Sequence, residues 1–273
     1  MGSYLQNVQN KIDYENALRT EETSSKTFFK KFDSDFIELL LIGDEHIGAK
    51  NYHSDLHKKV LESSYNDKRY IIHMGDGLET ATRNSIGAGI YEQAEIIDKQ
   101  VNTFQALYQP FVDEKLFLGG HPGNHEMRVF KDEGLNLTRH MYREMKARYF
   151  GIAKVSILRV GNQTYTLYTT HGSSGAQLPY TKIKGALDME KIIDVELYAM
   201  GHVHQLSHHV RNYNKPNLRN KTLETKQKHF VLTGSYLDYW DSYAQIKNLE
   251  PARMGSPIIK LYGDEHRIKA SLQ

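Results

Sequence analysis

The chain has no cysteine, and it has only six prolines and one tryptophan among 273 residues. The lack of cysteine excludes a disulfide framework, a thiolate nucleophile and a zinc site made of thiolates, so any metal site must use nitrogen and oxygen ligands. Long apolar runs are also missing, and the mean hydropathy is −0.60. We therefore expect neither a membrane-spanning helix nor a secretory leader, and we expect a cytoplasmic location.

An excess of charge of one sign is missing as well, since 35 Lys and Arg stand against 33 Asp and Glu. The net charge of +2 gives no general argument for a nucleic-acid partner, so any basic surface must be local. Hydrophobic residues make up 39% of the chain, which is enough for a large core, and no linker composition interrupts it. The sequence predicts an N-terminal arm over residues 1–35 and a single domain over residues 36–273.

Three short apolar runs in the first half of the chain end near glycine, which is typical of strands buried on both faces. They are Asp33–Ile42, Arg69–Met74 and Lys115–Leu118. Helical spacing of apolar residues separates them at His53–Ser64 and at Glu92–Tyr108, where the pattern stops before a proline. This order predicts β-α-β units.

The second half of the chain changes to alternating apolar residues after a helical segment at Gly134–Tyr149. Val155–Val160 and Thr164–Thr169 flank a Gly-Asn pair, which predicts an antiparallel hairpin. A helix at Thr181–Ile193 is expected to precede further strands at Glu196–Met200, Leu206–Val210, His229–Thr233, Pro257–Leu261 and Arg267–Leu272. The pattern predicts an α/β (α+β) protein with two packed sheets and helices outside them.

Metal-ligand residue types follow directly on the ends of five predicted strands. They are Asp44, His46, Asp76, Asn124, His125, His171, His202 and His204. Side chains at strand ends are held by a rigid sheet and face an open crevice, as a catalytic site requires. Because alternate residues of an extended chain point to one side, Asp44 and His46 can bind one ion together, as can His202 and His204.

The sequence around these residues adds two expectations. Glycine precedes Asp44, Asp76, Asn124 and His202, which is expected to let the backbone turn sharply there. The mixture of carboxylate, amide and imidazole favours Mn, Fe, Zn or Ni over calcium. Each fragment alone also fits a capped turn or a histidine with an ordinary hydrogen bond, so the ordered series carries the prediction.

This series resembles that of the calcineurin-like metallophosphoesterases, which runs D-x-H, G-D, G-N-H-[D/E], H and G-H-x-H. The resemblance spans Gly43 to His204, and Leu232 to Ser235 is similar to the Gly-Ser strand end that closes the fold. It implies a four-layer α/β/β/α sandwich with two mixed sheets and an enzyme that hydrolyses phosphate esters. Many relatives carry a further acidic residue soon after G-D, where this chain has Glu79, which either takes that place or is irrelevant.

Carried over residue by residue, the resemblance implies two divalent ions, most simply Mn²⁺, with Fe, Zn or Ni as alternatives. One ion would be held by Asp44, His46, Asp76 and His204, and the other by Asp76, Asn124, His171 and His202. Asp76 would bridge the pair, and a bridging hydroxide would supply the nucleophile. The resemblance also implies that His125 faces the substrate. Glu126 would orient that imidazole, or would be an exposed carboxylate in a turn.

The sequence gives weaker signals for substrate-binding residues than for metal ligands. Arg83, in a loop expected at Thr80–Ile90, and Arg128, after G-N-H-E, are candidate phosphate ligands, although each also fits a solvated surface arginine. A basic segment around residues 211–228 reads as a hairpin insertion that can follow a polynucleotide backbone. Seven histidines outside the motif series, His57 and His229 among them, are expected at the surface. His73 and His121 lie beside the motifs, where they could orient a ligand, pack in the core or be exposed.

Aromatic residues near the closing strand, Tyr236, Tyr239 and Trp240, could stack bases or pack in the core. Together with the basic segment they favour a phosphodiesterase acting on DNA or RNA, similar to the DNA-repair nuclease branch of the family. A nucleotide or other small-molecule phosphoesterase, a protein phosphatase and a non-catalytic scaffold remain as alternatives.

Overall fold

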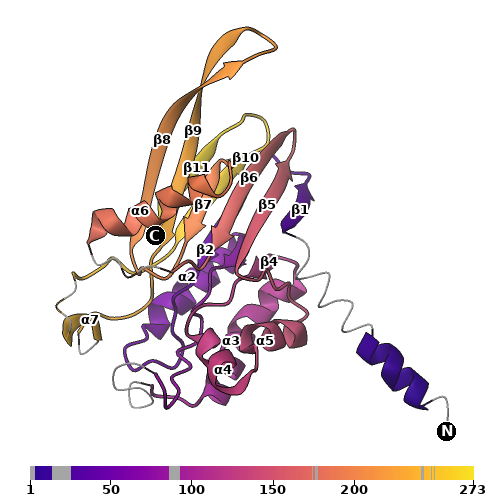
Figure 1. Cartoon of the computed structure of the whole chain (residues 1–273), viewed down its shortest axis with the longest axis vertical. Coiled ribbons are helices and arrows are strands. Elements are labelled where there is room, and N and C mark those ends of the chain that lie inside the picture. Colours follow the sequence, from indigo (N-terminus) through magenta and orange to yellow (C-terminus); the bar gives the residue numbers. More distant parts are fainter. Residues whose placement is uncertain are drawn as a thin grey trace.

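The computed structural model describes residues 4–13, 26–85, 93–173, 175, 178–240, 243–246, 248 and 250–273. Two β-sheets pack face to face, with helices on both outer sides (Figure 1). Part of the loop predicted at Thr80–Ile90 lies outside the described residues. Within them, no helix is both long and apolar enough to cross a membrane.

Both sheets are mixed. The five-stranded sheet has the order β11 (Ile268–Leu272), β10 (Pro257–Tyr262), β2 (Phe36–Ile42), β3 (Tyr70–His73) and β4 (Phe117–Gly120). The six-stranded sheet has the order β1 (Thr27–Phe32), β5 (Ala153–Val160), β6 (Gln163–Thr170), β7 (Leu197–Met200), β9 (Thr222–Thr233) and β8 (Leu206–Asn217). The strands β2, β3 and β4 run parallel, as do β6, β7 and β9, so their carboxyl ends gather at common edges.

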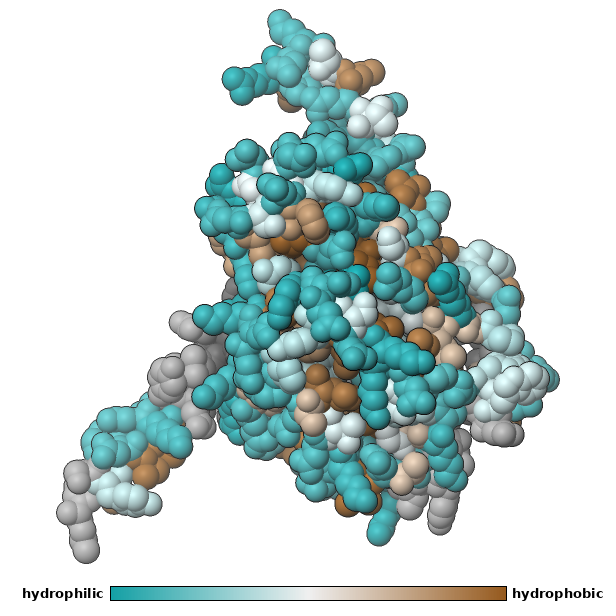
Figure 2. All heavy atoms as spheres, turned by 180° about the vertical axis from the view of Figure 1, so that it is seen from behind, coloured by the Kyte–Doolittle hydropathy of each residue, from teal (hydrophilic) through white to brown (hydrophobic). Residues whose placement is uncertain are grey.

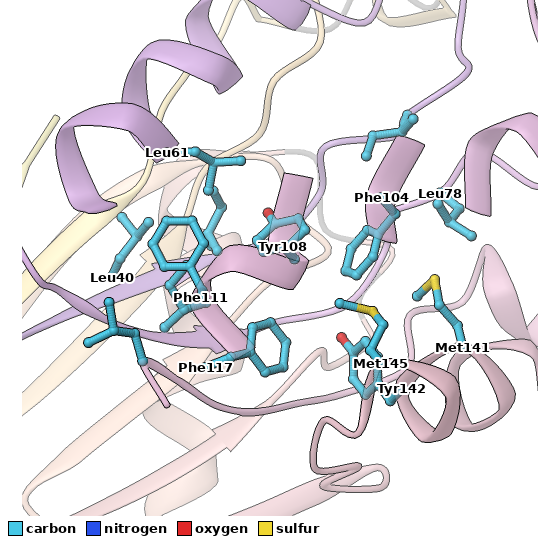
Figure 3. Packing of buried hydrophobic residues seen from close by; sticks show 14 of the residues in the cluster. Leu40, Leu61, Leu78, Phe104, Tyr108, Phe111, Phe117, Met141, Tyr142 and Met145 are labelled. Carbon is cyan, nitrogen blue, oxygen red and sulfur yellow. The ribbon is translucent and has the colours of Figure 1, made fainter. Parts of the chain in front are cut away.

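Helices cover the outer face of each sheet. They are α2 (Ser54–Asn66), α3 (Ile97–Asp113), α4 (Glu126–Glu133), α5 (Leu137–Met145), α6 (Pro179–Asp188) and the 3₁₀ turn η2 (Met189–Lys191). The short helix α7 (Tyr243–Ile246) lies apart from both sheets (Figure 1). Successive residues of β2 divide between two cores, as a strand buried on both faces must. Leu40 packs with α2, α3 and α5 in the cluster that Figure 3 shows, whereas Leu39 and Leu41 face the other sheet.

A third cluster joins the six-stranded sheet to α6 and η2 through Ala186, Met189, Tyr198 and Phe230. The order of layers is therefore helices, five-stranded sheet, six-stranded sheet, helix. This confirms the predicted α/β class and the four-layer α/β/β/α sandwich.

The boundary predicted for the N-terminal arm is wrong. Residues 27–32 lie inside the predicted arm of residues 1–35, yet they form β1, which pairs parallel with β5. Phe28 and Phe32 are buried between the sheets, so this strand belongs to the folded domain. Only two apolar side chains in the strand face inward, and a pattern that short is weak evidence for a strand from sequence alone.

Two of the histidines expected at the surface are buried. His57 is 0% exposed and His229 is 4% exposed. His57 lies between two tyrosine hydroxyls, with Nδ1 2.7 Å from Tyr52 and Nε2 3.1 Å from Tyr108. Burial lowers the pKa of His57 to about 4. Burial likewise lowers the pKa of His121 to about 3, and that ring lies against Gly151 O and Thr169 Oγ1.

We expect the protein to lose stability as the pH falls from 7 to 5. The unfolded chain takes up protons near pH 6.5 at His57 and His121, whereas the folded chain does not until well below pH 5. The stabilisation is therefore complete above pH 6.5 and is lost on acidification, by about 2 kcal/mol per histidine at pH 5.

Urea unfolding in EDTA at both pH values measures this loss. His57→Gln should lose about 2 kcal/mol less than the unchanged protein between pH 7 and pH 5. His209→Gln, at an exposed position on β8, is the matched control and should lose as much as the unchanged protein. An equal loss in His57→Gln would show that this ring does not titrate as its burial requires.

Candidate metal centre

The predicted ligands come from the carboxyl ends of five strands in both sheets. Asp44 and His46 follow β2, Asp76 follows β3, Asn124 follows β4, His171 follows β6, and His202 and His204 follow β7. Backbone hydrogen bonds join the first two loops, from Asp44 N to Gly75 O (2.9 Å) and from His46 N to Asp76 O (3.0 Å). The edge where the two sheets meet therefore carries every ligand type in the series.

The first group consists of Asp44, His46 and His204. The Nε2 atoms of His46 and His204 lie 3.1 Å apart, and His204 Nε2 lies 3.3 Å from Asp44 Oδ1. The sequence separates these histidines by 158 positions. Three ligand atoms from two sheets thus converge on one point.

The second group consists of Asp76, His171 and His202, with Asn124 between them. His171 Nε2 lies 3.2 Å from Asp76 Oδ2 and 2.9 Å from Asn124 Oδ1. His202 Nδ1 lies 2.6 Å from the same amide oxygen. The backbone N–H of His202 donates to the Asp44 carboxylate, which links the two groups.

Hydrogen bonds at the far nitrogens orient the histidine rings. His46 Nδ1 lies 3.0 Å from Glu79 Oε2, and His171 Nδ1 lies 2.9 Å from Met74 O. When Nδ1–H donates to these oxygens, Nε2 of each ring is left with a free electron pair that faces its group. This is the arrangement by which outer hydrogen bonds usually fix metal-binding histidines.

Charge balance at this edge favours bound cations. Five carboxylates are buried there, with exposures of 0% for Asp44 and Glu45, 1% for Asp76, 7% for Glu79 and 3% for Glu126. In the described parts of the chain, Arg128 is the one Lys or Arg side chain that forms an ion pair with any of them. Buried carboxylates are costly unless paired or bound to metal. The residues therefore fit divalent cations held by nitrogen and oxygen ligands.

The pKa values reflect the same concentration of negative charge. Burial by itself lowers the pKa of His171, but the carboxylates of Asp76 and Asp44 outweigh it and raise that pKa to about 10. Burial opposes the ionisation of Asp76, yet His171 and His125 hold its pKa well below the usual range. Negative charge from buried carboxylates is thus concentrated around the second group.

Backbone strain marks the ligand positions themselves. Asp44, His46, Asp76, His202 and His204 all have φ between 50° and 68°, in the left-handed region that residues other than glycine rarely adopt. Each such residue costs on the order of 1 kcal/mol, and strain of this kind clusters at functional sites.

The expectation that the preceding glycines allow sharp turns holds at Gly75, whose φ is 94°, but it is wrong for the other three. A Cβ atom at Gly43 would lie 2.9 Å from Gly75 O, and one at Gly201 would lie 2.8 Å from the Asp44 carboxylate. A Cβ atom at Gly123 would overlap with the Asp76 carboxylate. These glycines serve close approach of the ligand loops, and at Asp44 and His202 the ligands themselves bend the chain.

His125, Glu79 and Arg128 form a third group beside the first. His125 Nδ1 lies 2.9 Å from Glu79 O and 3.3 Å from Glu79 Oε2, while its Nε2 lies 2.8 Å from an Arg128 nitrogen. The rings of His125 and His46 pack edge to face at 4.3 Å. Burial opposes protonation of His125, but Asp76 and Glu79 outweigh it and raise the pKa of this histidine. Glu79, which the sequence left open, therefore contacts both a ligand histidine and His125.

Glu126 has a different place from the one predicted. Its carboxylate accepts hydrogen bonds from the backbone N–H groups of Gly123 (2.8 Å), Leu78 (2.9 Å) and Asp76 (3.2 Å), and it is buried. Burial and the nearby Asp76 raise the pKa of Glu126. Glu126 thus joins the Asp76 loop to the Asn124 loop and is not an exposed carboxylate. Within the described part of the chain, its hydrogen bonds go to backbone N–H groups and not to the His125 ring.

Of the two arginines predicted to contact a phosphate, only one lies at the candidate site. Arg128 lies against His125, as described, whereas Arg83 is exposed in a turn where, among the described residues, it has no ion pair with a carboxylate. Tyr236 is fully buried and cannot stack a base, which corrects that prediction. Trp240 is 72% exposed and packs edge to face with Tyr239 at 5.4 Å.

No protein-family model matches the chain, and no curated protein sequence matches it. Among solved structures, a double mutant of Vps29 from Entamoeba histolytica is 14% identical with a TM-score of 0.38, over 87% of this chain and 99% of that one. A predicted phosphoesterase from Streptococcus pneumoniae is 11% identical with a TM-score of 0.36, over 87% and 98%. A Thermotoga maritima protein is 16% identical with a TM-score of 0.36, over 87% and 99%.

The ordered ligand series and the four-layer sandwich occur together in this chain. Every motif lies at a strand end on the shared edge of the two sheets, as the resemblance implied. The chain therefore combines a four-layer α/β/β/α sandwich with a residue series that resembles that of the calcineurin-like metallophosphoesterases.

Proposed function

We propose that the protein is a metal-dependent phosphoesterase that hydrolyses phosphodiester bonds in nucleic acid. One observation carries this proposal: seven ligand-type side chains from five strand ends converge in two linked groups amid buried carboxylates, of which, in the described parts of the chain, Glu79 alone pairs with a Lys or Arg. A metal site that only stabilises a fold is usually closed to solvent, whereas a catalytic site keeps a ligand position open. His202 and His204 are only partly buried, so this edge is accessible to a substrate.

The residues fit two divalent ions, and Mn²⁺ suits the mixture of carboxylate, amide and imidazole ligands. Asp44, His46 and His204 would hold one ion, and Asn124, His171 and His202 the other, with Asp76 shared between them. When bound, the ions would neutralise the charge of the phosphate and activate water at neutral pH.

His125 is proposed to donate a proton to the leaving oxygen of the ester as that bond breaks. Its raised pKa favours the protonated form that this step requires. Glu79 would hold the ring through Nδ1. The Arg128 guanidinium, which lies 2.8 Å from His125 Nε2, would move to a phosphate oxygen when substrate binds and so free Nε2 for the leaving oxygen. These are roles in binding, orientation and proton transfer that side chains of this protein can perform.

Hydrolysis of bis-p-nitrophenyl phosphate in Mn²⁺, measured beside cleavage of labelled single- and double-stranded DNA, tests the proposal. We expect both activities, and we expect EDTA to abolish them and Mn²⁺ to restore them. Hydrolysis of the small diester without cleavage of DNA would instead indicate a nucleotide or other small-molecule substrate. No turnover of any of these substrates would contradict the assignment as a phosphodiesterase.

A further inference from the structure

The strands β8 and β9 form a hairpin whose outer half projects from the body of the molecule (Figure 1). Each strand has 12 residues, and they pair without interruption from Leu206 opposite Thr233 to Asn217 opposite Thr222. The inner ends are buried, but no residue in 211–227 is. Residues 211–228, called the arm below, have no core of their own, so stability alone does not explain their length.

The arm concentrates positive charge. It contains six Lys and Arg residues and a single acidic residue, Glu224, so its net charge is +5. The whole chain carries only +2, which leaves the rest of the molecule with −3. The positive charge is therefore local, and it lies on a part of the fold that projects into solvent (Figure 1).

Strand alternation places the strand cations on one face. Arg211 pairs with Lys228, Tyr213 with Lys226 and Lys215 with Glu224, and these residues point to the same side as the α6 cluster residue Phe230. The opposite face carries uncharged groups, and Gln227 donates to Asn212 there while Thr225 donates to Asn214. The arm is thus a two-stranded ribbon with one basic face.

Ion pairs neutralise the cations at the base of the arm but not those near its tip. Glu190 on η2 binds both Arg211 (2.5 Å) and Lys228 (2.8 Å), and Asp194 also binds Lys228 (2.6 Å). Lys226 pairs with Glu224 within the arm. Among the described residues, Lys215, Arg219 and Lys221 have no ion pair, so three cations remain for a partner.

The apolar side chains of the tip are few and exposed. Leu218 is 88% exposed and Leu223 is 75% exposed, and the projecting end is otherwise hydrophilic (Figure 2). Two leucines are too small a patch for a stable protein interface, which buries roughly 800 Å² on each side. They can make apolar contacts with base edges in a groove, such as the contact with the thymine methyl group.

We propose that the arm binds double-stranded DNA. The major groove of B-form DNA, about 12 Å wide, admits a two-stranded β-ribbon, whereas the deep, narrow major groove of duplex RNA does not. Lys215, Arg219 and Lys221 contact phosphates, and the tip leucines contact the groove.

The proposal rests on the proposed function for its substrate but concerns binding alone. The strand β8 begins two residues after His204, and its 12 residues span about 40 Å to the tip. Cations at that distance act on affinity and not on the reacting atoms. The arm therefore anchors a duplex over roughly a dozen base pairs from the metal centre.

The test uses the full chain with Lys215, Arg219 and Lys221 replaced by Gln, and fluorescence anisotropy of a labelled 30-base-pair duplex in EDTA. We expect affinity to fall at least about tenfold near 0.1 M salt, and the slope of log K against log salt to become less steep by about 2 to 3. The matched control replaces Asn212, Asn214 and Gln227 by Ala on the opposite face and should bind as the unchanged protein does.

Hydrolysis of bis-p-nitrophenyl phosphate and the thermal midpoint should be unchanged in the triple Gln variant. Unchanged affinity and salt slope in that variant would overturn the proposal, as would equal losses in both variants or equal affinity for single-stranded DNA. If the protein hydrolyses nothing but the Gln variant still loses duplex binding, the proposed function fails while the arm keeps its assignment.

Discussion

Replacing His202 by Ala will remove one of two bound Mn²⁺ ions and nearly all hydrolysis of bis-p-nitrophenyl phosphate. In the structure its Nδ1 lies 2.6 Å from Asn124 Oδ1, so the imidazole and the amide converge on one point in the second group. A catalytic metal supplies several kcal/mol of charge stabilisation, and 4 kcal/mol corresponds to about 10³ in rate. We therefore expect kcat/KM to fall by about 10³-fold or more.

Metal content per chain, measured together with kcat/KM, makes this result specific. His209→Ala is the matched control, because His209 is an exposed histidine on β8. It should keep two ions and full activity. The left-handed backbone of residue 202 remains strained in the Ala variant, so the thermal midpoint must be measured as well. Two bound ions and full turnover in His202→Ala would end the assignment of this residue as a ligand.

The strands that position the site were predictable because their signals are local. β2, β3 and β7 are apolar runs buried on both faces, and each lies within the segment predicted for it. Each is followed directly by ligand-type residues, so the sequence could predict that those side chains meet at one edge. The meeting itself depends only on parallel strands ending together.

The elements that the sequence did not predict are either exposed to solvent, and so lack an apolar pattern, or are held by tertiary contacts. The outer parts of β8 and β9 lack a buried face, so no alternation of apolar residues extends the predicted strands to their full length. The helix α3 continues through Pro110 to Asp113, because a proline removes only one backbone donor and tertiary packing of Phe111 holds the last turn. Helix α4 is too short and too polar for a periodic signal.

Within the candidate site, residue types were predictable but their partners were not. The sequence placed Glu126 beside the imidazole that precedes it, and the fold turns that carboxylate toward three backbone N–H groups instead. The sequence did not decide whether Glu79 belongs to the site, although in the structure its side chain contacts His46 and His125. The identity of a buried carboxylate's partner is decided by loops that are close only in three dimensions, which no spacing rule encodes.

Replacing His125 by Ala should separate binding from chemistry. His125 lies beside the first group and contributes no atom to the two groups proposed to bind metal, since its ring contacts Glu79 and Arg128. The variant should therefore keep both ions. Loss of a general acid typically costs about 10² to 10⁴ in rate, so kcat should fall by that factor while KM changes little.

The leaving group makes this prediction sharper. A p-nitrophenolate leaves readily without a proton, whereas the alkoxide released from DNA requires one. The loss in His125→Ala should therefore be larger by at least about tenfold on DNA than on bis-p-nitrophenyl phosphate. His140→Ala, at a partly buried histidine on α5 that pairs with Glu144, is the control. Equal losses on both substrates would assign His125 to binding of the phosphate, because a residue that only stabilises phosphate oxygens acts on every ester alike.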